Sequence, residues 1–181
     1  MQYVMFDTAW GPFGFVTRDD RLVATLLPQP ADRVREHISV LFPNAVETRG
    51  LLPKFRRQVI NYFLGQPSAL SVQVDLSGQP EFGVSVLKAC RRIPYGRTAS
   101  YADLARAVGK PGAARAVGGA MAHNPVPLVI PCHRVIRSDA SLGGFSSMEG
   151  VTQKERLLRL ENAWAPPPLS ARRNGSSGRS K

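Results

Sequence analysis

Cysteine is scarce in this sequence, acidic residues are outnumbered, and long apolar runs are missing. The two cysteines, Cys90 and Cys132, belong to no CxxC pair and have no cluster of histidines beside them. We therefore expect neither a metal site nor a disulfide framework, and a reducing compartment is indicated. The first residues lack a basic stretch followed by an apolar run, so we expect no signal peptide. Because the apolar runs are too short to cross a bilayer, we expect a soluble cytoplasmic protein.

Basic residues dominate the charge. Lys and Arg number 24 against 13 acidic residues, which gives a net charge of +11 and a pI near 10.6. The stretch from Pro166 onward holds four of the basic residues and no acid, so the rest still carries +7 of the +11. Because the chain is basic even without the stretch from Pro166 onward, a polyanionic partner is suggested, and nucleic acid is the first candidate. A merely basic protein is the alternative that charge alone leaves open.

The first part of the chain is expected to be α/β. Short apolar runs separated by turn residues predict the strands of a small antiparallel meander, at 3–8, 13–17 and 22–27. Helical periodicity then follows at 31–42 and 53–64, and one more strand is expected at 71–76.

A polar stretch, Ser77-Gly78-Gln79-Pro80, predicts a domain boundary. The predicted units are an N-terminal α/β domain, a C-terminal domain and a disordered basic tail, at 1–78, 79–164 and 165–181. From Glu81 onward the pattern changes to short helices. Cys90 lies on the apolar side of the first of them, so we expect it to be a buried, inert thiol.

Two short helices in the second part form a helix-turn-helix pattern. Ser100 and Asp103 have the spacing of a capping box at the start of the first helix. Gly109 is expected to stop that helix, and Pro111 to open the next, which covers 113–121. Two helices joined by a short turn containing glycine are typical of a DNA-binding motif.

The second of these helices is unusually smooth. Arg115 is its one long polar side chain, whereas helices that read a DNA sequence carry several. Gly118 and Gly119 each cost about 1 kcal/mol relative to Ala in a helix interior, so they need a reason. Close approach to a DNA backbone is one explanation, and tight packing against another helix of the protein is the other. The local residues favour neither.

A proline-rich apolar segment from Asn124 to Val135 carries the reactive groups. It leads to Cys132, which is followed at once by His133. A thiol attacks as the thiolate, and a neighbouring base or positive charge lowers its pKa. Neighbouring side chains on an extended strand point to opposite faces, so the pair can cooperate only if the chain turns at Cys132 or a water relays the proton.

A carboxylate near the end of the last helical pattern, at 151–164, provides a third group. Glu161 follows Leu157 and Leu158 at helical spacing, which places it on the apolar side. A carboxylate there needs a partner. His133 is one candidate, in a nucleophile–base–orienter arrangement, and one of the many arginines is the other.

Taken together, these motifs resemble a known family. Ile130-Pro131-Cys132-His133-Arg134-Val135 is similar to the active-site signature of the O6-alkylguanine-DNA alkyltransferases, also called methylated-DNA–protein-cysteine methyltransferases. The resemblance covers roughly 82–161 and includes the blocks at 92–96, 100–101, 113–121 and 124–125. It implies an α+β fold, with an RNase H-like N-terminal domain and a winged-helix-like, helix-rich domain that carries the helix-turn-helix.

The resemblance implies a role for each residue of the reactive site. Cys132 accepts the alkyl group, His133 takes the thiol proton through a water, and Glu161 orients His133. Tyr101 helps to rotate the damaged nucleotide and bonds to its base, and Asn124 braces the turn before the reactive segment. The implied activity is that of a methylated-DNA–[protein]-cysteine S-methyltransferase that acts once, needs no cofactor and works as a monomer on double-stranded DNA.

The resemblance also implies two sets of binding residues. In this family the second helix lies in the minor groove, and Arg115 replaces the flipped nucleotide. The residues expected at the DNA are Tyr101, Ala102, Lys110, Ala114, Arg115 and Ser138. Those expected around the flipped base are Tyr101, Met121, Val135, Phe145 and Ser146.

The sequence departs from the family at two places. Phe145 stands where the family commonly has Tyr, and the stretch 146–151 is about two residues longer, so the preferred alkyl group, and guanine versus O4-methylthymine, stay open. Three alternatives are a lesion-binding protein without transfer, a helix-turn-helix transcription factor and a Cys-His hydrolase. The first would lack Cys132, the second would need more polar side chains beside Arg115, and the third would have no use for a basic groove.

Overall fold

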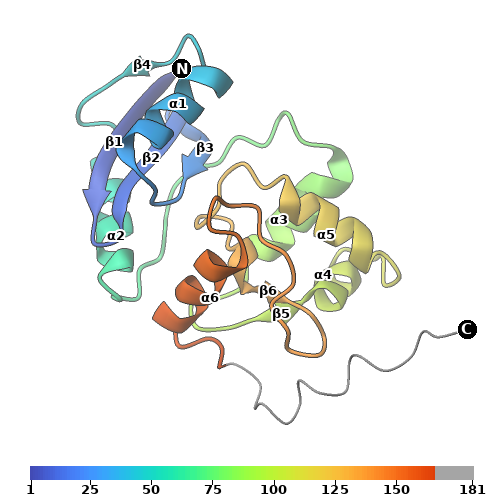
Figure 1. Ribbon diagram of the computed structural model, residues 1–181. Helices are drawn as coiled ribbons and strands as arrows, with labels where there is room; N and C mark the ends of the chain where they lie inside the picture. Colours follow the sequence, from blue (N-terminus) through green and yellow to red (C-terminus); the bar gives the residue numbers. More distant parts are fainter. Residues whose placement is uncertain (166–181) are drawn as a thin grey trace, which may run out of the picture.

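The computed structural model describes residues 1–165 of the 181. Apart from its first residue, the predicted basic tail lies outside the described residues. Within the described part, no helix is both long enough and apolar enough to cross a membrane. Figure 1 shows the sheet of the first part on one side of the molecule and the short helices of the second part on the other.

A four-stranded sheet forms the first part, in the order β3-β2-β1-β4. The strands are β1 (Gln2–Thr8), β2 (Gly11–Arg18), β3 (Arg21–Leu26) and β4 (Val46–Glu47). The predicted antiparallel meander is confirmed for β1, β2 and β3. The two-residue strand β4, which the sequence pattern did not predict, pairs parallel with β1.

Both faces of the sheet are covered by the two predicted helices, α1 (Ala31–Leu41) and α2 (Pro53–Phe63). Successive side chains of β2 point to opposite faces, so Phe15 packs toward α2 while Val16 packs toward α1. Gly14 allows α1 to lie close, because a Cβ at this position would stand 2.7 Å from Val34 Cγ1.

The prediction of a strand at 71–76 is wrong. The segment makes only an isolated parallel bridge, between Val74 and Leu22. The Leu22 amide donates to Gln73 O at 2.9 Å, and the Asp75 amide donates to Leu22 O at 2.8 Å, near the start of β3. Within the described residues the backbone of this segment pairs with the sheet at this one residue of β3, so no ladder forms.

Short helices and one small parallel pair of strands make up the second part. They are α3 (Glu81–Arg91), β5 (Ala99–Ser100), α4 (Tyr101–Ala107), α5 (Ala114–Ala122), the 3-10 turn η1 (Cys132–Arg134), β6 (Val135–Ile136) and α6 (Val151–Leu160). The α+β fold class is thereby confirmed. The capping box at Ser100 and Asp103 is present, and Gly109 has a φ of +71° just after α4. Pro111 lies in the turn before α5 rather than opening the helix.

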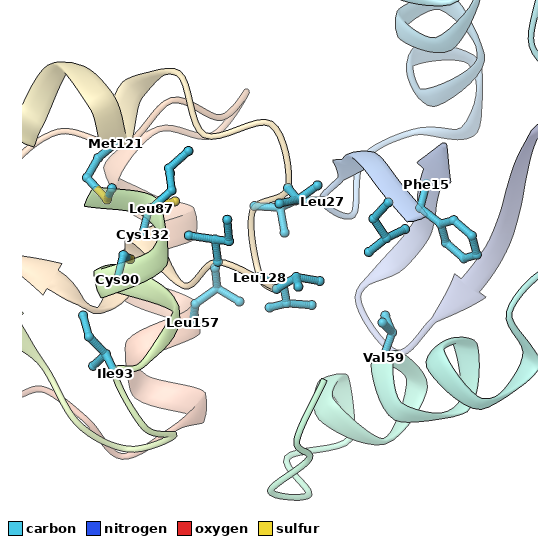
Figure 2. Packing of buried hydrophobic residues seen from close by; sticks show 14 of the residues in the cluster. Phe15, Leu27, Val59, Leu87, Cys90, Ile93, Met121, Leu128, Cys132 and Leu157 are labelled. Atoms are coloured by element: carbon cyan, nitrogen blue, oxygen red, sulfur yellow. The ribbon is translucent and has the colours of Figure 1, made fainter. Parts of the chain in front are cut away.

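One apolar cluster continues through both parts of the chain. Leu27, just after β3, and Leu128 from the reactive segment lie between the two groups of core side chains in Figure 2. Hydrogen bonds follow the same line, because Thr25 of β3 donates from its amide to Pro125 O at 3.0 Å and from its hydroxyl to Pro127 O at 2.7 Å. β3 thus holds the segment that leads to Cys132, and the division into domains after residue 78 stays a prediction.

Candidate active site

The chain turns at Cys132. Its amide donates to Ile130 O at 2.8 Å, and the amide of Arg134 donates to Pro131 O at 2.9 Å, which closes the 3-10 turn η1. The extended arrangement that would separate Cys132 from His133 is therefore absent here. The first condition for their cooperation, a turn at the cysteine, is met.

Asn124 fastens the segment that precedes this turn. Its Oδ1 accepts from the amide of Val126 at 3.1 Å, and its Nδ2 donates to Ile130 O at 2.8 Å and to Cys132 Sγ at 3.2 Å. Between these contacts Leu128 is buried with a φ of +77°, a region that side chains rarely adopt. The bonds from Asn124 and the packing of Leu128 therefore hold a loop that would otherwise relax.

The Cys132 thiol is not activated in the resting protein. Burial raises its pKa above the ordinary value, although the hydrogen bond from Asn124 and the positive charge of Lys154 act in the opposite direction. The expectation that a neighbouring base or charge would lower the pKa of this thiol is wrong, because loss of hydration outweighs both. Cys132 is a neutral thiol near pH 7 and must give up a proton when it attacks.

His133 is fully buried beside Glu161. Its Nε2 lies 2.9 Å from Glu161 Oε1, and burial lowers the pKa of the imidazole despite that carboxylate. The ring is therefore neutral near pH 7. Its other nitrogen, Nδ1, is buried without a hydrogen-bond partner among residues 1–165. A carboxylate at Nε2 fixes the hydrogen there and leaves Nδ1 as the basic atom.

Both partners considered for Glu161 are present at once. Besides His133, the carboxylate accepts from Arg134 Nε at 2.8 Å and from a terminal nitrogen of Arg134 at 2.9 Å. It also accepts from the Tyr62 hydroxyl at 2.6 Å and the Gly96 amide at 3.1 Å. Burial alone would raise the pKa of Glu161, but the hydrogen bonds from His133 and Arg134 and the positive charge of Arg134 bring it to about 2. Glu161 is therefore ionised throughout the physiological range.

Sequence reasoning missed Tyr62 as a member of the site. It stands 99 residues before Glu161, on α2 of the first part, and no local pattern connects the two. It also missed Lys154, for which a signal existed. Lys154 lies three residues before Leu157 and four before Leu158, and this helical spacing puts it on the apolar side of the helix, as it does for Glu161.

The buried Lys154 fastens the loop after β6. Its Nζ donates to Val135 O at 2.6 Å, to Gly144 O at 3.4 Å and to the carbonyl of Leu142, and it lies 5.8 Å from the ring centre of Tyr101. Burial lowers its pKa to about 8. The ammonium thus ties the loop to β6 next to the reactive cysteine.

A cavity of about 220 Å³ opens beside Cys132. Four of the five residues expected around the base line it, with Cys132 itself and three small residues of α5 and the loop: Tyr101, Met121, Phe145, Ser146, Cys132, Gly118, Ala122 and Gly144. Val135 is not among them, because it is fully buried and its carbonyl accepts from Lys154. Gly143 allows Tyr101 to lie against the loop, since a Cβ at this position of φ +68° would stand 3.0 Å from the Tyr101 hydroxyl.

A second hollow, of about 390 Å³, shares Tyr101, Gly118 and Gly144 with the first. Five of the six residues expected at the DNA line it, together with Arg137 and Gly143: Tyr101, Ala102, Ala114, Arg115 and Ser138. Lys110 does not, because it lies exposed in the turn between α4 and α5. Sequence reasoning did not include Arg137, which adds a second guanidinium.

The glycines of α5 are not explained by packing inside the protein. A Cβ at Gly119 would have no atom within 4 Å, and one at Gly118 would make only an ordinary contact of 3.9 Å with Tyr101. Val117 and Met121 are the buried residues of this helix. The face with Arg115 and Gly119 is open, which removes the reason for the packing alternative at Gly119.

Comparison with known proteins agrees with this arrangement. Residues 81–163 match the sequence model of the 6-O-methylguanine DNA methyltransferase, DNA binding domain. A constitutive methylated-DNA–protein-cysteine methyltransferase of Bacillus subtilis is 37% identical over 159 residues, which cover 88% of this chain and 94% of that protein. The chain belongs to the methylated-DNA–protein-cysteine methyltransferase family.

Other members of the methyltransferase family resemble the chain in sequence and in structure. A Mycobacterium tuberculosis member is 44% identical over 113 residues, 62% of this chain and 67% of its own length. The crystal structure of M. tuberculosis OGT in complex with DNA superposes with a TM-score of 0.75 at 32% identity, over 92% of this chain and 96% of that one. The likeness therefore extends into the first 80 residues, well beyond the motifs. Tyr62 lies outside the matched methyltransferase domain, whereas Cys132, His133 and Glu161 lie inside it.

Proposed function

We propose that this protein repairs DNA by moving an alkyl group from O6 of guanine onto Sγ of Cys132. The observation that carries the proposal is a buried thiol in the wall of a 220 Å³ cavity, next to a second hollow with Arg115 and Arg137 at its edge. Membership of the methyltransferase family supports it, as does the OGT structure solved in complex with DNA.

The chemistry is a displacement at the alkyl carbon. A bond forms between Sγ and that carbon while the bond from the carbon to O6 breaks, and guanine leaves with the electron pair. His133 Nδ1 receives the thiol proton through a bridging water, and the hydroxyl of Tyr101, which lines the cavity, gives a hydrogen bond to the base. The proton finally returns to guanine, so the reaction is balanced without a cofactor. A base with pKa below its usual range stays unprotonated at neutral pH and can accept that proton.

The damaged nucleotide must leave the helix to reach Cys132, which costs a few kcal/mol of stacking and pairing. We infer that α5 enters the minor groove with its open Gly119 face and that Arg115 occupies the space left in the stack. A smooth face and phosphate contacts suit a protein that must act in any sequence context. We propose O4-methylthymine as a second substrate, to be tested in the same way, because its displacement follows the same chemistry.

The transferred group ends in a thioether, which is chemically stable, so each molecule acts once. This proposal predicts a stoichiometric reaction rather than turnover. The lesion itself supplies the alkyl group.

The two cysteines give a matched test. Duplex DNA containing one O6-methylguanine is incubated with the wild type, with Cys132→Ala and with Cys90→Ala, and methyl transfer is measured by peptide mass spectrometry. We expect transfer by the wild type and by Cys90→Ala, because the Cys90 thiol is fully buried and lines neither hollow. Transfer that persists in Cys132→Ala would refute the proposal. Tight lesion binding without transfer by the wild type would support the lesion-binding alternative instead.

A further inference from the structure

Tyr62 connects the sheet half of the molecule to the reactive site. It is fully buried near the end of α2, and its hydroxyl donates to Glu161 Oε1 at 2.6 Å. The ring packs edge-on against Phe63, with ring centres 5.3 Å apart, and against Tyr95, at 5.9 Å. The hydroxyl is therefore held by two aromatic contacts and does not move freely.

The oxygen that Tyr62 contacts is the one that holds His133. Oε1 of Glu161 accepts from Tyr62, from His133 Nε2 at 2.9 Å and from Arg134 at 2.9 Å. The other oxygen accepts from Arg134 Nε and from the Gly96 amide. The Tyr62 hydroxyl also lies 3.5 Å from His133 Nε2, so the three groups form one compact cluster.

Glu161 needs such support because of its place in the chain. It is the residue at the C-terminal cap of α6, after the last residue of the helix, Leu160. Helix ends fray more easily than helix interiors. The side chain is fixed by donors from outside the helix, one of which comes from a part of the chain about one hundred residues away.

We propose that Tyr62 is a positioning residue for the transfer reaction: its hydroxyl, brought from the sheet half of the chain, holds the carboxylate of Glu161 where it orients His133. The inference rests on the proposed function for its kinetic consequence. Tyr62 itself touches neither the cavity beside Cys132 nor the hollow beside Arg115.

The charges around His133 give the direction of the effect. Glu161 and Lys154 face it from the end and the middle of α6, Arg134 from η1, Cys132 precedes it, and Tyr62 contacts it from α2. Removing the Tyr62 hydroxyl takes one donor from Oε1 and leaves the carboxylate more negative toward the imidazole. His133 then becomes easier to protonate, so its pKa rises, while the carboxylate loses one of its fixed contacts.

Tyr62→Phe tests this, with Tyr95→Phe as the matched control. Tyr95→Phe removes a hydroxyl from the aromatic ring that packs against Tyr62. That hydroxyl donates to Leu160 O at 3.1 Å and not to the Glu161 side chain. Single-turnover methyl transfer is measured from pH 5 to pH 9, and the pKa of each of the three histidines by NMR. Tyr62→Phe loses a hydrogen bond to a charged group, which is stronger than one between neutral groups. We therefore predict that the plateau of the single-turnover rate is about tenfold lower in this variant. In Tyr62→Phe we also expect the acid limb of the pH–rate profile to move to higher pH and the pKa of His133 to rise. Neither should change in Tyr95→Phe.

Three results would overturn the inference: wild-type values in Tyr62→Phe, equal shifts in both variants, or an unchanged pKa of His133. The wild type offers a check that needs no variant, because NMR should show the His133 hydrogen on Nε2 and a slowly exchanging tyrosine hydroxyl proton. A hydrogen on Nδ1 would exclude the arrangement. Failure of the proposed function looks different, since the wild type would then transfer no methyl while the NMR shifts would remain.

Discussion

The two parts of the molecule contribute very different groups to the site. Residues 81–165 supply the cysteine, the imidazole, the carboxylate and both hollows, whereas residues 1–80 supply the Tyr62 hydroxyl and the β3 bonds to the reactive segment. Their charges differ as well, with twelve basic and six acidic residues in 81–165 against eight and seven in 1–80. The excess of positive charge therefore belongs to the part of the chain on which we place the DNA. The part with the sheet contributes hydrogen bonds that hold the reactive segment and Glu161 in position.

The largest difference in unfolding free energy and in methyl transfer is expected between Glu161→Ala in the second part and Asp75→Ala in the first. Glu161→Ala leaves Arg134 and His133 buried without their shared acceptor, and breaking a buried pair of this kind costs about 3–5 kcal/mol of unfolding free energy. Methyl transfer should be lost with it. Asp75→Ala removes the exposed pair with Arg18 and should leave both quantities near wild type. Urea unfolding measures the difference, and equal effects would remove the distinction between the two parts.

Acid should act through the same carboxylate. The pKa of Glu161 in the folded protein is about 2 against an ordinary 4.5, so the unfolded chain binds more protons between these values. Its stabilisation is complete above about pH 4.5 and is lost as the pH falls toward 2. Urea midpoints between pH 6 and pH 2.5 should therefore fall less steeply in Glu161→Gln than in the wild type. Parallel slopes would show that Glu161 is not the group that titrates.

Arg115 is expected to matter only for DNA. It is exposed at the start of α5 and lines the second hollow, so Arg115→Ala should leave the unfolding free energy unchanged. Transfer from duplex DNA should slow by about tenfold, because the flipped state loses its replacement in the stack. Arg33→Ala, an exposed arginine of α1 paired with Glu36, serves as the control from the sheet part. A similar loss in both variants would point to total charge rather than to intercalation.

The smallest expected effect is at Gly119. An Ala here meets no atom within 4 Å and should stabilise α5 by up to about 1 kcal/mol. Binding to duplex DNA should nevertheless weaken, because the smooth face gains a methyl group. Thermal unfolding and fluorescence anisotropy measure the two quantities, and unchanged DNA binding would show that this face lies away from the groove.

Local patterns predicted most of the fold and the core of the site. Periodicity placed three strands, the helices and Glu161, because each depends on neighbours within a few residues. The strand expected at 71–76 failed because pairing depends on where the segment meets β3, which its own residues do not encode. Tyr62 could not be found for the same reason, since its partner comes from another part of the chain. The raised pKa of Cys132 also follows from burial, which only the folded structure reveals.

Transfer to Cys132 can be tested by counting methyl groups. Wild-type protein is mixed with an excess of duplex DNA containing O6-methylguanine, and intact mass and peptide mapping are recorded until the reaction stops. We predict one methyl group per protein molecule, carried on Cys132, with restored guanine in equal amount. A plateau above one methyl group removed per molecule, or a methyl group on any other residue, would contradict it.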